Sequence, residues 1–319
     1  MSMSKKVLIT SRSFGAITDE PFRILREAGI EWEQRGAVFS QAWFEDIIPE
    51  FDALIIGAHA FPADVMARCH KLQLVCKHGV GLDNIPLEKA KELGVVVCNA
   101  PGVNADAVAD LTFGLMLGAA RKIVLADRQV RQGKWNNVIG VDVCHKTLGL
   151  LGFGAVAKNV ARRARGFGMA VLAYDPYVTE LPEEFSGYVT LCDLDTVIGG
   201  ADFLSLHLPR TEETLGMIGE KELGRMKQGA FLINTSRGGI VREDALYEML
   251  RCGHLAGAAT DVSEKEPMAE DNPLRTLDNV IITPHIGMNS REATNAISVL
   301  CAENVAACLA GGEVKFRVV

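Results

Sequence analysis

The stretch "KTLGLLGFGAVAKNVARRARGFGMAVLAYDP", residues 146–176, decides the fold of this chain. An apolar run, 147–152, leads into the glycine motif GFGAVA at 152–157, and a segment with helical spacing follows. In such a G-x-G-x-x-A pattern the first glycine makes a tight turn and the second admits a ligand close to the backbone. The third small residue lets the helix pack closely on the strand. We therefore predict a strand, a turn and a helix of a parallel α/β sheet.

The next apolar run, 170–175, ends in Asp175, about 20 residues beyond the glycine motif. In dinucleotide-binding units the helix N-terminus faces the pyrophosphate, and a carboxylate at this place holds the ribose hydroxyls of NAD and repels the extra phosphate of NADP. The alternative is a packing turn followed by a surface aspartate. Because strand, helix and aspartate agree, we favour the first interpretation and predict NAD as the cofactor.

The same alternation of apolar runs and helical segments fills the rest of the chain. Four apolar runs precede the glycine motif and four follow its unit: 7–10, 53–57, 72–76 and 95–98, then 203–208, 230–235, 255–262 and 280–284. Strands that alternate with helices predict parallel sheets covered on both faces. Residues 104–135 are largely apolar and free of proline, and we expect one long helix there, buried between domains or subunits, with Asn104 as its N-cap.

Composition excludes several classes of protein. The chain has 319 residues, 48% hydrophobic, with a net charge of −7 and scattered Lys and Arg, so we expect two domains and no nucleic-acid partner. No apolar run approaches the length of about 18 residues that a membrane helix needs, and the start "MSMSKKVLIT" is typical of a first strand rather than a signal peptide. The eight cysteines form no C-x-x-C pair, which favours free thiols in a reducing cytoplasm and no metal site.

Three residues of complementary chemistry lie at or just beyond the ends of predicted strands: Arg237, Glu266 and His285. Ligands of open parallel sheets bind outside the carboxyl ends of the strands, so we expect these side chains to converge. Histidine shuttles protons near neutral pH, a carboxylate on its other nitrogen fixes its tautomer, and arginine binds carboxylates through a planar fork.

Each residue also has a purely structural interpretation. Arg237 could be a surface residue, Glu266 a turn residue before Pro267, and His285 a core residue. Taken together behind a dinucleotide turn, the three residues favour hydride transfer between a nicotinamide cofactor and a 2-hydroxy acid.

At this point the chain resembles the NAD-dependent D-isomer-specific 2-hydroxyacid dehydrogenases, especially their phosphoglycerate dehydrogenase-like branch. The resemblance covers nearly the whole chain. It rests on the glycine motif with Asp175 and on "KHGVGLDNI" (77–85), "NAPGVNADAVAD" (99–110), "HLPRTEET" (207–214), "NTSRGGIV" (234–241), "DVSEKEP" (261–267) and "TPHIG" (283–287).

The resemblance implies two Rossmann-like, doubly wound parallel-sheet domains with the active site in the cleft between them. Residues 1–101 and 288–319 would form the substrate domain, and 102–287 the NAD-binding domain. Arg237 would bind and polarise the substrate, His285 would act as acid and base, and Glu266 would support it. Family members are usually homodimers, to which the long helix contributes.

The resemblance also implies binding residues. The backbone of Val80 and Gly81 would hold the substrate carboxylate, with Asn104 nearby. The cofactor would contact Gly152, Phe153, Gly154, Ala155, Val156, Asp175, Pro176, His207, Leu208, Pro209, Thr214, Thr235, Ser236, Arg237, Asp261, His285 and Gly287. The chain departs from the family at Ser263, where an aromatic residue is common, and at Met288, where glycine or alanine is usual.

Two cations bear on the choice of substrate. Lys77 precedes the "GVG" turn, where phosphoglycerate enzymes often have a basic residue, and Arg12 follows the first strand. A solvated or salt-bridged lysine is the alternative. However, His59 stands where some phosphoglycerate enzymes have arginine, and the chain stops at 319 without a regulatory extension.

We therefore favour 3-phosphoglycerate/3-phosphohydroxypyruvate, with a role in serine biosynthesis, over glyoxylate, hydroxypyruvate or a D-lactate-like acid. NAD-binding corepressors share the fold and the three residues and remain a remote alternative, although they carry long disordered tails that this chain lacks.

Overall fold

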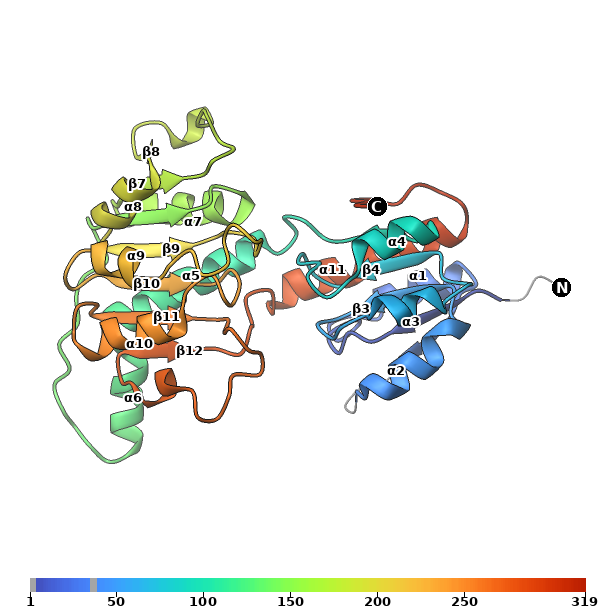
Figure 1. Ribbon diagram of the computed structural model, residues 1–319, viewed down its shortest axis with the longest axis horizontal. Coiled ribbons are helices and arrows are strands. Elements are labelled where there is room, and N and C mark those ends of the chain that lie inside the picture. Colours follow the sequence, from blue (N-terminus) through green and yellow to red (C-terminus); the bar gives the residue numbers. More distant parts are fainter. Residues whose placement is uncertain (1–3, 35–38) are drawn as a thin grey trace. The chain divides into compact units, whose positions relative to one another are not determined.

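The computed structural model describes residues 4–34 and 39–319 (Figure 1). The chain forms two compact units, each built on its own parallel sheet. Residues 1–104 and 288–319 make the first unit, and residues 105–287 make the second. Residues 102–104, which we predicted in the middle domain, lie in the first unit. The predicted class of two doubly wound α/β domains is confirmed.

The first sheet has five parallel strands in the order β2-β1-β3-β4-β5. Its strands are β1 (Lys6–Ile9), β2 (Glu31–Gln34), β3 (Ala53–Ile56), β4 (Leu74–Lys77) and β5 (Val96–Cys98). The central strands are continuous apolar runs because both faces of the sheet are buried.

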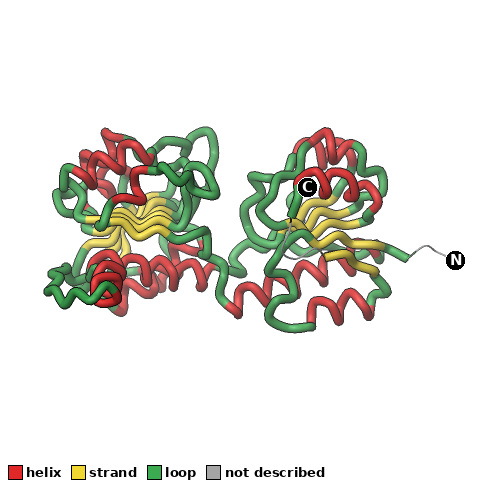
Figure 2. The backbone as a smooth tube through the Cα atoms, turned by 90° about the horizontal axis from the view of Figure 1, so that it is seen from below, coloured by secondary structure: helices red, strands yellow, loops and turns green. Residues whose placement is uncertain are grey.

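Helices cover both faces of this sheet (Figure 2). One face packs against α1 (Glu20–Glu27) and the C-terminal α11 (Arg291–Leu309). The other face packs against α2 (Gln41–Ile47), the short 3-10 helix η1 (Ile48–Glu50), α3 (Ala63–Ala67) and α4 (Leu87–Leu93). Helix α11, from the far end of the sequence, therefore completes the core that the first hundred residues begin.

The second sheet has seven parallel strands in the order β12-β11-β10-β9-β6-β7-β8. They are β6 (Thr147–Leu151), β7 (Ala170–Tyr174), β8 (Val189–Leu191), β9 (Phe203–Leu206), β10 (Phe231–Asn234), β11 (Gly257–Thr260) and β12 (Val280–Ile282). Since every strand points the same way, all the carboxyl ends lie along one edge of this sheet.

Two groups of helices cover the second sheet. On one face α5 (Ala105–Ala120) packs beside α7 (Ala155–Gly166). On the other face lie α8 (Leu194–Gly200), α9 (Glu220–Arg225) and α10 (Glu243–Arg251). The short 3-10 helices η2 (Glu183–Phe185) and η3 (Pro273–Thr276) lie in the connecting loops. In the part of the chain that the structure describes, no helix combines the length and apolar character needed to span a bilayer.

The prediction of one long buried helix at 104–135 is wrong. The chain instead forms α5 and a separate α6 (Ile123–Arg131), with Lys122 in the left-handed region at φ +53° between them. The returning chain causes the break: Val141 donates a backbone hydrogen bond to the Ala120 carbonyl (2.9 Å), which ends α5. Helix α6 buries none of its residues in this chain.

Every predicted strand is present, but the sequence pattern missed β2 and β8. Each of these is an edge strand of its sheet. The β2 sequence, EWEQ, is mostly polar, and none of its four residues is buried at this edge of the described sheet.

Candidate active site

The candidate residues of the second unit line the carboxyl edge of its sheet in an unbroken order. Strands β12, β11, β10, β9, β6 and β7 are consecutive neighbours in the sheet. In that order their ends lead into His285, Asp261, Arg237, His207, the glycine turn and Asp175. Residues separated by more than a hundred positions in the sequence thus share one edge.

The glycine turn uses its small residues as the pattern predicted. Gly152 has φ +89°, and a Cβ there would lie 2.5 Å from the His207 carbonyl oxygen. No heavy atom lies within 4 Å of a Cβ built on Gly154, and Ala157 is fully buried against the strand. The amides of Ala155 and Val156, in the first turn of α7, have no acceptor among the described residues. Open space and two amides at a helix N-terminus fit a pyrophosphate.

Asp175 is held in place by the turn that it faces. One carboxylate oxygen accepts the Phe153 amide (2.8 Å), and the other accepts the amide of Tyr177 (2.9 Å), beyond Pro176. The aspartate therefore links the end of β7 to the glycine turn after β6. This is the place at which a carboxylate meets the ribose of NAD in dinucleotide-binding units.

The turn after β9 forms the next part of the edge. Burial lowers the pKa of His207 to about 3, so the ring is neutral, and its Nε2 lies 2.9 Å from Ser205 Oγ. Leu208 is buried beside Gly152. The Thr214 hydroxyl donates to the Pro209 carbonyl (2.7 Å), so it stabilises its own turn.

Arg237 is positioned by Asn234, a residue that the sequence analysis missed. The Asn234 side chain donates to the Arg237 carbonyl (3.1 Å) and accepts the amide (3.0 Å) and hydroxyl (2.8 Å) of Ser236. Arg237 Nη1 donates to the Ser236 carbonyl (2.8 Å), and the Thr235 hydroxyl meets Thr112 of α5 (2.9 Å). An asparagine at a strand end that bonds the backbone two residues on is a recognisable turn signal.

Gly238 brings the Arg237 turn against the loop that carries Glu266. A Cβ on Gly238 would lie 1.8 Å from the Ser263 carbonyl oxygen, so no other residue fits without moving one of the two segments. Ser263 in turn donates its amide to Glu266 Oε1 (3.2 Å). This bond uses only the backbone of residue 263, while the Ser263 hydroxyl donates to the Lys265 carbonyl in the same loop.

Glu266 and His285 form a hydrogen-bonded pair, with Glu266 Oε2 2.8 Å from His285 Nδ1. Burial opposes ionisation of Glu266. The hydrogen bond and charge of His285, the Ser263 amide and the charge of Arg237 outweigh it and lower the pKa of the glutamate. Both side chains of the pair remain about two-fifths exposed. A carboxylate on Nδ1 leaves Nε2 as the nitrogen that can exchange a proton with a ligand.

Asp261 holds the turn that carries His285. Its carboxylate, 1% exposed, accepts the Thr283 hydroxyl (2.6 Å) and the amides of Ile286 (2.8 Å) and Gly287 (2.7 Å). Its carbonyl accepts the His285 amide (2.8 Å). These bonds keep His285 in the left-handed region at φ +53°, which is rare for a residue with a Cβ. Oδ1 accepts two of these bonds and Oδ2 only one, so the expected cofactor contact of Asp261 would have to involve Oδ2.

In the first unit, the "GVG" turn follows β4 and presents two backbone donors. Neither the Val80 nor the Gly81 amide has an acceptor within residues 4–34 and 39–319. The Asn99 side chain donates to the Val80 carbonyl (2.7 Å), and the Ala100 amide donates to the Gly79 carbonyl (2.9 Å). Two amides on a turn held in this way can bind an anion.

The predicted cations of the first unit lie at the same edge of its sheet. Lys77 Nζ donates to the Gly57 carbonyl (2.8 Å) and to Asn84 Oδ1 (2.7 Å), and these bonds help to orient it. Arg12 is exposed beyond the end of β1, and Asn104 is the last residue before the second unit. Met288 belongs to the first unit, where its sulfur packs over Gly79.

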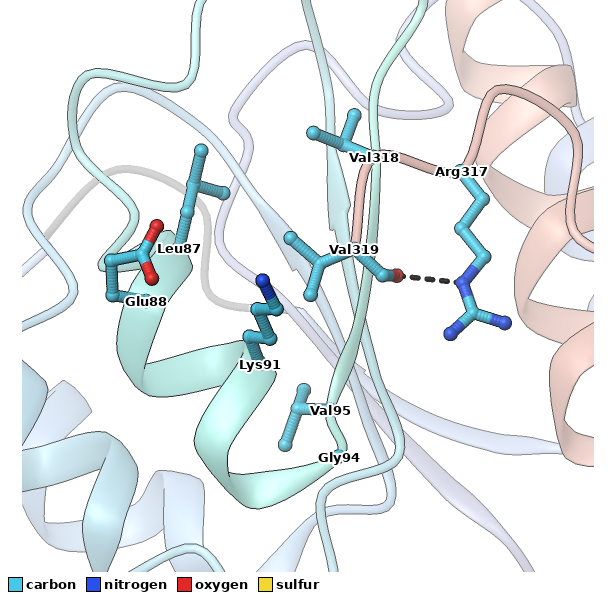
Figure 3. Close-up of a pocket in the computed structure, with 8 residues that line it drawn as sticks. All are labelled: Leu87, Glu88, Lys91, Gly94, Val95, Arg317, Val318 and Val319. Carbon is cyan, nitrogen blue, oxygen red and sulfur yellow. Dashed lines mark hydrogen bonds between the residues drawn. The ribbon is translucent and has the colours of Figure 1, made fainter.

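A pocket of about 460 Å³ lies elsewhere in the first unit, between α4 and the final residues of the chain (Figure 3). None of the predicted site residues lines it. The described residues also contain no group of three or more His, Cys, Asp or Glu side chains arranged to hold a metal ion.

Comparison with known proteins agrees with this geometry. Residues 113–287 match the family described as "D-isomer specific 2-hydroxyacid dehydrogenase, NAD binding domain". A D-3-phosphoglycerate dehydrogenase from Archaeoglobus fulgidus is 40% identical over 91% of this chain, and the chain spans 55% of that protein's length. A glyoxylate reductase from Korarchaeum cryptofilum is 43% identical over 82% of this chain and 80% of its own length.

Among solved structures, the TT0316 protein from Thermus thermophilus superposes with a TM-score of 0.91 and 36% identity, covering 98% of this chain and 100% of that one. The matched NAD-binding region coincides with the unit that carries the glycine turn and Asp175. The chain therefore belongs to the D-isomer-specific 2-hydroxyacid dehydrogenases.

Proposed function

We propose that this protein is a dehydrogenase that transfers a hydride between NAD(H) and a D-2-hydroxy acid or the matching 2-oxo acid. The observation that carries the proposal is the Glu266–His285 pair at the same sheet edge as the glycine turn. The second unit would be the NAD-binding domain and the first the substrate domain. Bound NAD supplies the hydride acceptor or donor.

Under this proposal His285 makes the proton transfer. Because Glu266 stays ionised and occupies Nδ1, His285 would exchange a proton with the substrate oxygen through Nε2. The carboxylate stabilises the charged imidazole and fixes its orientation. Arg237, whose turn is fixed by Asn234, would bind the substrate and polarise its carbonyl in the reverse direction.

The first unit would bind the substrate's acidic groups. The amides of Val80 and Gly81 would receive the carboxylate common to all 2-hydroxy acids, with Asn104 nearby. Lys77 and Arg12 would receive a second anion. On this basis 3-phosphoglycerate/3-phosphohydroxypyruvate is the favoured pair. The similarity to a glyoxylate reductase makes glyoxylate or hydroxypyruvate the second candidate.

A panel of 2-oxo acids that includes 3-phosphohydroxypyruvate, glyoxylate and hydroxypyruvate, each tested with NADH and NADPH, distinguishes these substrates. We expect the highest kcat/KM with 3-phosphohydroxypyruvate and NADH. The substitution Lys77→Met should raise KM for the phosphorylated acid much more than KM for glyoxylate. An equal rise for both acids would refute phosphate recognition by Lys77. If NADH binds and no acid is reduced, the dehydrogenase proposal fails.

We further propose that the protein is a homodimer, joined through α6 and the segment that follows it. This region exposes six large apolar side chains: Ile123, Val124, Val130, Trp135, Ile139 and Val141. Trp135 is 90% exposed, an unusual state for tryptophan in the absence of a partner. A second copy with the same apolar surface would cover it by two-fold symmetry.

Sedimentation velocity tests the dimer. Trp135→Glu combined with Ile139→Glu should produce monomers. Tyr177→Glu, at a residue 87% exposed outside this region, is the matched control and should leave the dimer intact. A dimer that survives the double substitution would place the interface elsewhere.

The cysteines support a reducing compartment. All eight are free thiols in the structure, and four of them are buried in the first unit. We therefore propose that the protein works in the cytoplasm.

A further inference from the structure

Glu266 lies in a loop, residues 263–272, that is anchored from outside by helix α10. Glu243, the first residue of α10, accepts the Glu264 amide on Oε1 (2.7 Å). Its other oxygen, Oε2, accepts the Asn272 side-chain amide (2.6 Å). A single carboxylate thus binds a residue near each end of the loop.

The loop also makes a contact in the opposite direction, to the backbone of the helix. Glu264 Oε1 accepts the Glu243 amide (2.9 Å), across 21 residues of sequence. The N-cap residue of α10, Arg242, makes no side-chain cap, so Glu264 supplies the acceptor that the first turn of the helix lacks. Each glutamate carboxylate therefore accepts the backbone amide of the other glutamate, and the two bonds tie the helix to the loop.

The anchored segment leads directly to the catalytic pair. Glu264 is two residues before Glu266, and Ser263, one residue before Glu264, donates its amide to Glu266 Oε1 (3.2 Å). Glu266 Oε2 then meets His285 Nδ1 at 2.8 Å. A shift of the loop by about 1 Å would break this contact, and misplacements of that size cost up to about 100-fold in rate.

We propose that Glu243 is a positioning residue, which sets the contact between Glu266 and His285 through its reciprocal bonds with Glu264 and its bond to Asn272. This inference rests on the proposed dehydrogenase function of the same site. Glu243 touches neither substrate nor cofactor in this scheme, and it acts only through Glu266.

A double-mutant cycle tests the proposal. Glu243→Ala in the full chain should lower kcat by about 10- to 100-fold while the Kd for NADH, from fluorescence titration, stays within about twofold. In the E266Q background the same substitution should change kcat by less than about twofold, because its route of action is already lost. An equal loss of kcat in both backgrounds would overturn the proposal.

Matched variants separate positioning from helix stability. Asp244→Ala removes the neighbouring acid of the same first turn, which pairs with Arg242 and does not contact the loop. It should leave kcat within about twofold. Glu243→Gln keeps one acceptor oxygen and should recover part of the activity that Glu243→Ala loses. If the alanine variant does not fold, Glu243→Gln replaces it in the tests. A loss of kcat for D244A equal to that of E243A, or no recovery by E243Q, would overturn the positioning role.

Crystal structures of the E243A or E243Q variant and of D244A give a readout that needs no activity. We expect the Glu266–His285 contact to open beyond hydrogen-bond distance in the Glu243 variant and to persist in D244A. An unchanged contact in the Glu243 variant would refute the inference. If the wild type reduces no acid, the proposed function fails while these structures still decide the positioning role.

Discussion

Replacement of Asp261 by asparagine tests how the His285 turn is held. The carboxylate accepts three hydrogen bonds, from the Thr283 hydroxyl and the amides of Ile286 and Gly287. Asparagine keeps one oxygen and turns an NH2 group toward at least one of these donors. A hydrogen bond to a charged group contributes about 1.5–3 kcal/mol, so a turn that stayed in place would lose about 2–4 kcal/mol.

The turn can instead leave its native backbone conformation, which lowers the stability of the protein by less. The left-handed backbone at His285 costs about 1–3 kcal/mol, and this cost is recovered when the turn leaves its native conformation. We therefore expect the free energy of unfolding to fall by only about 1–3 kcal/mol, while kcat falls about 100-fold because His285 is displaced. Thr283→Val, which removes one of the three bonds to the carboxylate, should cost about 1.5–3 kcal/mol.

Urea unfolding measures the stability of Asp261→Asn, steady-state kinetics give kcat, and fluorescence titration gives the NADH affinity. Because the carboxylate is 1% exposed, we expect the Kd for NADH to change by less than about threefold. A variant with normal kcat would refute the support of the His285 turn by Asp261. A variant that loses NADH affinity but keeps kcat would instead make Asp261 a cofactor contact.

Three further predictions concern the same sheet edge. Gly154→Ala should leave thermal stability unchanged, since nothing lies within 4 Å of its Cβ, but it should weaken NADH binding more than about tenfold. Gly152→Ala should instead destabilise the fold by at least about 2 kcal/mol, because its Cβ meets the His207 carbonyl at 2.5 Å. A G154A variant with normal NADH affinity would contradict the proposed approach of the pyrophosphate to this glycine. His285→Ala should keep NADH affinity in titrations and lower kcat by about 100- to 10,000-fold, and an unchanged kcat would remove its acid–base role. Because the folded pKa of Glu266 lies below its ordinary value of 4.5, its pairing stabilises the fold above that pH and is lost as the pH falls through the lowered pKa. At pH 6 the free energy of unfolding from urea titration should thus be higher for the wild type than for Glu266→Gln, by less than about 1 kcal/mol for this partly exposed pair. The difference should vanish in acid, and a pH-independent difference would contradict this reasoning.

Much of the fold could be predicted from local sequence. Buried parallel strands are continuous apolar runs, so each of the central strands was recognisable, and the glycine motif with Asp175 marked the dinucleotide turn. Arg237, Glu266 and His285 were recognisable because each lies at or just beyond a strand end with suitable chemistry. The structure brings Glu266 and His285 into contact, while the catalytic roles of all three remain predictions.

The residues that hold this site were not predictable in the same way. Asn234 follows a local turn pattern that can be recognised, but Glu243 and Glu264 act through hydrogen bonds to each other's backbone amides. The bond between the two glutamates spans 21 residues, and no local sequence pattern predicts a partner at that distance. The edge strand β2 was missed because its polar sequence lacks the apolar run of a central strand.

The break between α5 and α6 could not be predicted from local sequence either. Residues 104–135 contain no proline, and nothing at Arg121 and Lys122 marks the end of a helix. The chain ends α5 because the segment at 140–141 returns across it, where Val141 bonds the Ala120 carbonyl and a Cβ on Gly140 would lie 2.4 Å from that oxygen. Short-range patterns thus determined the strands and the glycine turn, because each reflects its own burial. Tertiary contacts alone decided the helix break and the support of Glu266, because each depends on a backbone group that arrives from a distant part of the sequence.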